Sequence, residues 1–201
     1  RSQTAINDGQ LDAESESKVR SNLYAAKLVV SGPLWKGRLS FGTEEMFTNR
    51  HNDFTQSGFS ADAFNHIRQS IYAGFLEYYL SIGRMNYGAG LRYEYQKTDY
   101  YEKDVLQAEQ SPSYRDWIPF ASIGYSKDNL NLAFSYRLNK YSPIYSMLQS
   151  SIDYDSKYEY KSGDPHLKPQ KQHSFNLSGN YKWLSFMAYY NYVLDIYMTW
   201  Y

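Results

Sequence analysis

Hydrophobic and polar positions alternate strictly along residues 87–96, which read Tyr-Gly-Ala-Gly-Leu-Arg-Tyr-Glu-Tyr-Gln. Every second residue from Tyr87 to Tyr95 is apolar or aromatic, and the residues between them are small, polar or charged. Because a β-strand sends successive side chains to opposite faces, this segment predicts a strand with one apolar and one polar face. The same pattern recurs in residues 130–139 and 173–182.

Extended along the chain, the pattern predicts about eight strands arranged as antiparallel hairpins. The strands are expected at residues 20–31, 34–48, 69–82, 85–101, 114–126, 130–141, 172–181 and 184–200. Tight turns are expected at residues 31–33, 83–84, 127–129 and 182–183, and long connections at 49–68, 102–113 and 142–171.

Short and long connections therefore alternate along the chain. This asymmetry is typical of an all-β, antiparallel up-and-down transmembrane β-barrel, with short periplasmic turns and long extracellular loops. A soluble sandwich would be expected to mix loop lengths at both ends.

The alternation also assigns side chains to faces. Toward lipid we expect Leu28, Val30, Leu39, Phe41, Leu76, Tyr78, Leu80, Ala89, Leu91, Tyr93, Ala121, Ile123, Tyr125, Leu132, Phe134, Tyr136, Phe175, Leu177, Tyr181, Phe186, Ala188 and Tyr190. Toward the interior we expect Lys27, Arg38, Glu77, Arg92, Glu94, Asn131, Arg137, Asn176, Asn180 and Asn191. Four of these, Glu77, Arg92, Glu94 and Arg137, are predicted lumen-facing charges that can form a cross-strand network. Such a network would fill a narrow barrel or line the solvent-filled interior of a wide one.

Composition supports this picture without naming a ligand. Aromatic residues make up 18% of the 201 residues, including 23 tyrosines, which suit a membrane boundary as well as strands. The formal net charge of zero argues against a nucleic-acid partner. The chain has no cysteine, which excludes disulfides and thiolate chemistry. A mean hydropathy of −0.68 is compatible with a barrel, whose interior face and loops are polar.

One segment resembles a known family motif. Residues 163–170 read Gly-Asp-Pro-His-Leu-Lys-Pro-Gln, which resembles the "GNP-x-LKPE" segment in the barrels of TonB-dependent receptors and their SusC-like outer-membrane relatives. Gly163, Pro165, Leu167, Lys168 and Pro169 match that motif. Asp164 stands where asparagine is commoner, and Gln170 where glutamate is commoner. From the two prolines, a rigid path from loop to strand is favoured over a direct ligand contact.

The resemblance implies part of a wide barrel in the bacterial outer membrane that houses uptake of an unknown solute. It implies outer-membrane lipid around the barrel, and a plug domain N-terminal to the barrel and TonB as partners of the full-length protein. We expect residues 1–19 to form a linker or loop and residues 20–201 to form the barrel segment. Both ends of the chain look cut, and the open strand edges of such a fragment invite self-association.

Other interpretations remain open from the residues alone. The chain can be a complete small eight-stranded barrel with a structural or adhesion role, or a soluble lipocalin-like carrier whose tyrosines line a cavity. No spacing indicates a catalytic constellation, a metal site or a cofactor site, so an enzyme is not expected.

Overall fold

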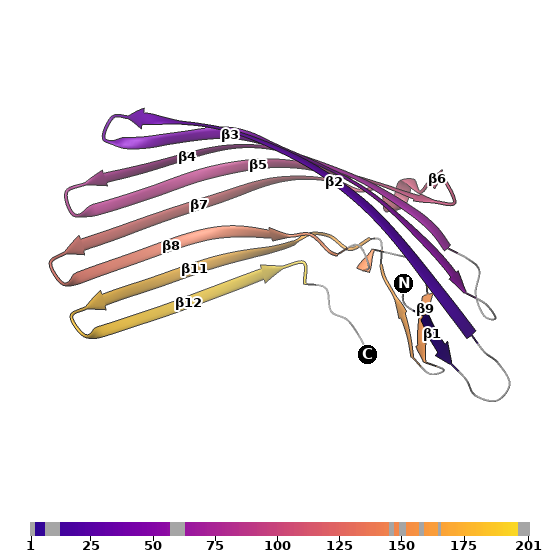
Figure 1. Cartoon of the computed structure of the whole chain (residues 1–201). Coiled ribbons are helices and arrows are strands. Elements are labelled where there is room, and N and C mark those ends of the chain that lie inside the picture. Colours follow the sequence, from indigo (N-terminus) through magenta and orange to yellow (C-terminus); the bar gives the residue numbers. More distant parts are fainter. Residues whose placement is uncertain are drawn as a thin grey trace.

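The computed structural model describes residues 3–6, 13–56, 63–144, 147–148, 152–156, 159–164 and 166–196. Most of the described residues form one curved layer of antiparallel strands, with tight turns at one end and longer connections at the other (Figure 1). We call these the turn end and the loop end.

Eight long strands make up the body of the sheet, as the alternation predicts. They are β2 (Ala13–Leu34), β3 (Gly37–Gln56), β4 (Ala63–Ile82), β5 (Met85–Glu102), β7 (Ser113–Lys127), β8 (Leu130–Tyr141), β11 (Gln170–Tyr181) and β12 (Leu184–Leu194). Each pairs with the next in this order, so the all-β, up-and-down prediction is confirmed.

The remaining elements are short and belong to the loop end. β1 (Gln3–Ile6) pairs with the start of β2, and β6 (Val105–Leu106) pairs with the end of β5. A 3₁₀ turn, η1 (Ala108–Gln110), lies between β6 and β7. β9 (Ile152–Ser156) and β10 (Glu159–Ser162) form a separate hairpin in the connection from β8 to β11.

The turns follow the prediction at three of four places. Two-residue turns at 83–84, 128–129 and 182–183 begin with residues of positive φ: Gly83, Asp128 and Lys182. The turn expected at residues 31–33 is wrong, because the chain turns at Trp35–Lys36 and Pro33 pairs with Arg38 inside the ladder. Pro33 is tolerated there because, among the described residues, no strand pairs with the other side of β2 along this stretch, so its missing N–H leaves no acceptor unpaired.

The strands run further toward the loop end than predicted. Residues 13–19, expected in a linker, belong to β2, and Ser15–Val19 pair with Asn52–Gln56 of β3. Residues 49–56 and 63–68, expected in a long loop, also belong to strands. Backbone pairing continues there although the alternation fades, because a ladder outside the membrane does not need an apolar side. At the other end of the chain, β12 stops at Leu194, and residues 197–200 of the predicted strand lie outside the described residues.

The register places the predicted lipid-side residues on one face, which we call the apolar face; the opposite one is the polar face. Phe41, Leu76 and Leu91 lie opposite one another on β3, β4 and β5, and Ile123, Phe134 and Leu177 do so on β7, β8 and β11. From Met85 to Tyr93 the band spans roughly 27 Å along the strand at about 3.4 Å per residue. Met85 to Tyr93 are nine residues, which agrees with the roughly nine to eleven residues that a tilted β-strand needs to cross a membrane.

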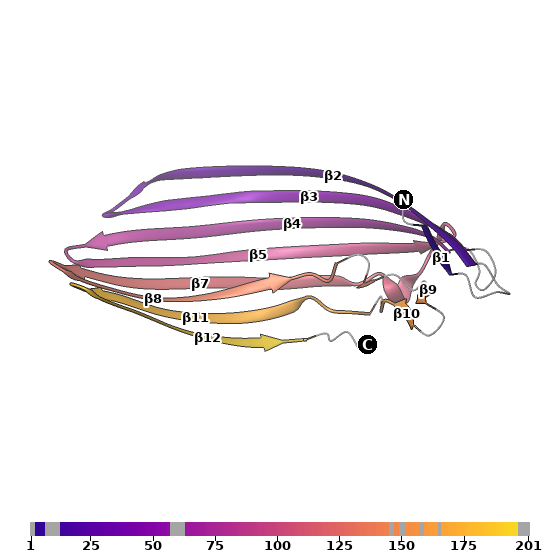
Figure 2. The same ribbon diagram turned by 60° about the horizontal axis from the view of Figure 1, so that its bottom comes forward.

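The sheet is open in the described residues. β2 and β12 lie at opposite sides of the layer, and no pairing joins them (Figure 2). Within the described residues the eight long strands therefore do not close into a barrel. The unpaired edges agree with a piece of a wider barrel.

Candidate functional site

A row of charged residues crosses five strands on the polar face. Lys27 lies opposite Glu44 of β3, Glu44 opposite Ala73 of β4, Ala73 opposite Glu94 of β5, and Glu94 opposite Asp116 of β7. The row exists because the polar position of each strand falls at the same height in the ladder. Ala73 is small, which leaves room for the longer side chains on both sides.

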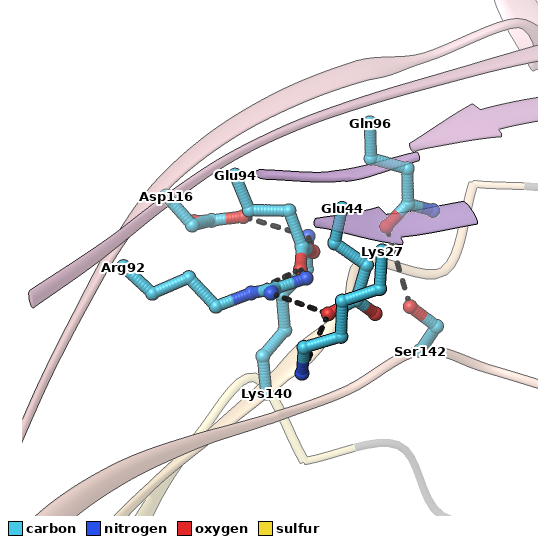
Figure 3. A network of polar contacts seen from close by, with 8 residues as sticks. All are labelled: Lys27, Glu44, Arg92, Glu94, Gln96, Asp116, Lys140 and Ser142. Atoms are coloured by element: carbon cyan, nitrogen blue, oxygen red, sulfur yellow. Dashed lines mark hydrogen bonds and ion pairs between the residues drawn. The ribbon is translucent and has the colours of Figure 1, made fainter. Parts of the chain in front are cut away.

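Arg92 joins the two halves of this row. Its guanidinium lies 3.1 Å from Glu44 Oε2 and 3.0 Å from Glu94 Oε2, and Lys27 Nζ lies 3.4 Å from Glu44 Oε2 (Figure 3). Without Arg92 the neighbouring carboxylates would repel one another. The network thus satisfies the acids in a cross-strand arrangement of alternating charge.

Two lysines from outside the row complete the cluster. Lys140 Nζ lies 2.8 Å from Glu94 Oε1 and 2.9 Å from Asp116 Oδ2, and Lys171 binds the other oxygen of Asp116. The side chains of Lys140 and Asp116 are each only 5% exposed. Burial of a charge is costly unless it is paired, so Lys140 and Asp116 can be buried here only because they form these ion pairs. We call Lys27, Glu44, Arg92, Glu94, Asp116, Lys140 and Lys171 the ion cluster.

Lys140 reaches the cluster because the end of β8 lies over the polar face. The β7–β8 ladder ends at Phe120 and Arg137, next to Pro119, which has no N–H to donate. Beyond that point Ser142 Oγ donates a hydrogen bond to Gln96 Oε1 on β5, at 3.3 Å (Figure 3). The bend brings Lys140, which by alternation belongs to the apolar face, onto the acids of the polar face.

The four predicted lumen-facing charges lie on the polar face, in two different settings. Arg92 and Glu94 belong to the ion cluster. Glu77 and Arg137 lie in the next row toward the turn end, which runs through Gly90 and Phe120. Arg137 stacks over the Phe120 ring at 5.2 Å, and no ion pair between described residues includes it. All four residues line one cavity of about 510 Å³.

Sequence reasoning missed Glu44, Asp116, Lys140 and Lys171. Alternation could have predicted two of them. Asp116 precedes Trp117 and Glu44 follows Thr43, and since Trp117 and Thr43 lie on the apolar face, both acids fall on the polar face. The positions of the two lysines could not be predicted from their neighbours in the sequence, because they depend on the bend at the end of β8, where Lys140 pairs with Lys171 of β11. Pro119 inside a strand is the one hint that the ladder is interrupted there.

A second cavity of about 390 Å³ lies next to the first on the polar face. Its lining is aromatic and polar: Tyr79, Phe120, Ser122, Ser135, Arg137, Asn139, Ser174, Asn176 and Asn191 are among the residues around it. The Tyr79 and Phe120 rings lie against Gly88 and Gly90, where a Cβ would come within 3.0 and 2.2 Å of them. Amides, hydroxyls and ring faces of this kind suit contact with a polar solute.

The motif segment lies at the loop end and its middle packs against the sheet. Asp164 Oδ1 accepts a hydrogen bond from the backbone N–H of His166 at 2.8 Å, which stabilises a turn. Asparagine, the commoner residue at this position of the motif, has a side-chain oxygen that can accept the same bond. Leu167 and Pro169 close a space of only about 20 Å³ over Ile67 and Tyr100.

The rest of the motif contributes less. Lys168 is exposed and Gly163 half-buried, while Pro165 lies outside the described residues. A space that holds about one water leaves no room for a ligand, which favours the structural interpretation of the motif.

Metal and helix signals are both missing from the described part of the chain. It holds no group of three or more histidines and carboxylates placed to bind a metal ion. It also contains no helix that is long and apolar enough to span a membrane.

Comparison with known proteins places the fold. The structure is similar to the copper transporter OprC, with a TM-score of 0.65 at 13% identity over 95% of this chain and 32% of that one. It is similar to the ferric yersiniabactin uptake receptor FyuA from Yersinia pestis, with a TM-score of 0.61 at 12% identity over 96% and 32% of the two chains. It is also similar to the alcaligin outer-membrane receptor FauA from Bordetella pertussis, with a TM-score of 0.54 at 14% identity over 88% and 29%.

The chain thus spans about a third of the length of these solved structures, and the likeness shows the fold. No curated protein matches the sequence. The resemblance to receptor barrels and the bacterial outer-membrane location are confirmed by the comparisons. The sequence matches the profile of the outer membrane protein beta-barrel family over residues 2–199, and the chain belongs to that family.

Proposed function

We propose that this chain forms one section of the wall of a wide outer-membrane barrel that houses TonB-dependent uptake of a solute. The observation that carries the proposal is the division of the sheet. The ion cluster and both large cavities lie on the polar face, while the apolar face carries no charge between Met85 and Tyr93 of β5. A wall between lipid and an aqueous interior needs this division.

The ion cluster is the proposed contact for a plug domain within the full-length protein. Its four cations and three carboxylates form ion pairs with one another, so it offers a firm surface with a cavity of about 510 Å³ beside it. Ile71, Phe75 and Ile118 add apolar contact area to the same cavity. Mixed apolar and charged surfaces of this kind are typical of interfaces between domains.

The test uses a photoreactive side chain in the full-length protein in its own membrane. At Ile118, on the polar face, we expect cross-links within the protein, to a plug domain. At Ile123, five residues along the same strand on the apolar face, we expect cross-links to lipid. Cross-linking of Ile118 to lipid, or of both sites to the same partner, would overturn the assignment of the two faces.

Uptake itself is tested in cells that produce the full-length protein, with and without TonB. A panel of labelled solutes is offered to both, and the proposal expects at least one solute to enter only when both proteins are present. If the cross-links form as expected but the solute also enters without TonB, the chain is still a section of the barrel wall, and the proposal of TonB-dependent transport is wrong.

A further inference from the structure

Above the lipid-facing band, four strands show the same order of side chains on the apolar face. Toward the loop end, an aromatic residue follows the apolar ones and a cation follows the aromatic one. On β7 the order is Trp117, then Arg115, and on β5 it is Tyr95, then Lys97. On the two other strands a polar residue intervenes, as in Tyr72-Ser70-Arg68 on β4 and Tyr24-Asn22-Arg20 on β2, counted along one face. We call Arg20, Arg68, Lys97 and Arg115 the basic rim.

Three cations of the rim lie on adjacent strands at nearly the same height. Arg115 is opposite Tyr95, two residues from Lys97, and Lys97 is opposite Ser70, two residues from Arg68. Diagonal neighbours in a ladder lie about 7–8 Å apart, within reach of long side chains. A single anionic headgroup can therefore contact more than one of these cations.

The rim residues are exposed and oriented by rings. Arg115 lies over Tyr95 at 5.7 Å, and Arg68 lies over Tyr101 at 5.4 Å. Among the described residues, no ion pair includes Arg68 or Arg115, whereas Lys97 pairs with Asp99 at 3.0 Å. Asp99 is half-buried and lies directly opposite Arg68, and Glu45 is exposed on the same face. Arg68 Nε also donates a hydrogen bond to His66 Nε2 at 3.4 Å, so its two terminal nitrogens and the guanidinium of Arg115 are the groups that can bind an anion.

We infer that the basic rim binds the phosphate headgroup of a lipid in the outer leaflet. The rim continues the lipid-facing surface directly, so the bound phosphate and the acyl chains below it belong to one molecule. Arginine binds phosphate through paired N–H groups, and the aromatic residues beneath it lie where a headgroup meets the hydrocarbon. This inference rests on the membrane location and not on the transport proposal.

The experiment titrates the folded full-length protein in detergent with diphosphorylated lipid A, and native mass spectrometry counts bound lipid. The triple variant Arg68→Gln, Lys97→Gln, Arg115→Gln should bind about tenfold to a hundredfold more weakly. The matched control removes three cations at the turn end, with Lys36→Gln, Arg84→Gln and Lys127→Gln, and should change binding about twofold or less.

Further arms separate phosphate recognition from general lipid binding. Dephosphorylated lipid A should bind the native protein as weakly as diphosphorylated lipid A binds the rim variant. If the triple variant does not fold, Arg115→Gln replaces it, and added salt should weaken lipid binding to the native protein. Equal binding of the two lipids, equal losses in rim and control variants, or no lipid bound by the native protein would overturn the inference.

Discussion

The turn-end and loop-end halves of the long strands are built from the same ladder but stabilised in different ways. At the turn end, Leu76 and Leu91 are about half exposed on the apolar face, and stability depends on lipid covering them. At the loop end, Thr48, Gln96 and Thr98 are buried although they are polar. The first half is shaped by its solvent and the second by its own polar contacts, so the same kind of substitution should have different consequences in the two halves.

The largest expected effect concerns the ion cluster at the border of the halves. Asp116→Ala removes the acid shared by Lys140 and Lys171 and leaves a buried cation short of a partner. We expect it to lower the free energy of unfolding by about 3 kcal/mol or more. Urea unfolding of the protein in lipid vesicles measures the change.

Asp99→Ala is the matched control for Asp116→Ala. It removes an acid from the exposed pair with Lys97 and should cost about 1 kcal/mol or less. Equal effects of the two variants would show that the cluster is not buried in the folded protein.

A new charge on the apolar face separates the halves directly. Leu76→Arg places a cation in the middle of the lipid-facing band and should cost about 2–4 kcal/mol. Ser70→Arg changes the same strand on the same face beyond the band and should cost less than about 1 kcal/mol. Unfolding in vesicles of both variants tests this, and a similar cost at the two positions would contradict the placement of the band.

The glycines under the aromatic rings give a third, smaller effect. A Cβ at Gly90 would lie 2.2 Å from the Phe120 ring, whereas a Cβ at Gly74 meets nothing within 4 Å. Gly90→Ala should therefore destabilise the fold by about 1–3 kcal/mol through overpacking. Gly74→Ala should be neutral or stabilising by a few tenths to about 1 kcal/mol. If the two alanine variants unfold alike, the Phe120 ring does not rest on Gly90.

The same contrast explains what the sequence could reveal. Alternation predicted the eight strands, three turns and the faces, because lipid on one side imposes a period of two on Tyr87–Tyr95 and similar segments. Beyond the band no solvent imposes that period, so the pattern did not predict that residues 13–19 and 63–68 continue as strands. The place of Lys140 was beyond local reasoning, because it depends on the interruption of the β7–β8 ladder at Pro119.

The smallest effect concerns the pH dependence of the loop end. His66 is 8% exposed, stacks on His51 at 3.9 Å and hydrogen-bonds Asn49 Oδ1 at 2.6 Å. Burial lowers the pKa of His66, and His51 and Arg68 lower it further, while Asp104 opposes them. In the unfolded chain a histidine has a pKa of about 6.5. Below that pH, the unfolded chain therefore binds a proton more readily at His66 than the folded protein does.

The sign of this effect follows from the lowered pKa. Stability is unaffected well above about pH 6.5 and falls as the pH drops below it, until His66 is protonated in the folded protein as well. Urea midpoints between about pH 8 and pH 5 should decline less in His66→Asn than in the native protein. The substitution His166→Gln, at an exposed position, is measured beside it for comparison. An unchanged slope in His66→Asn would mean that His66 is not kept neutral by burial, and the loop end would then lack the dry polar packing that distinguishes it from the turn end.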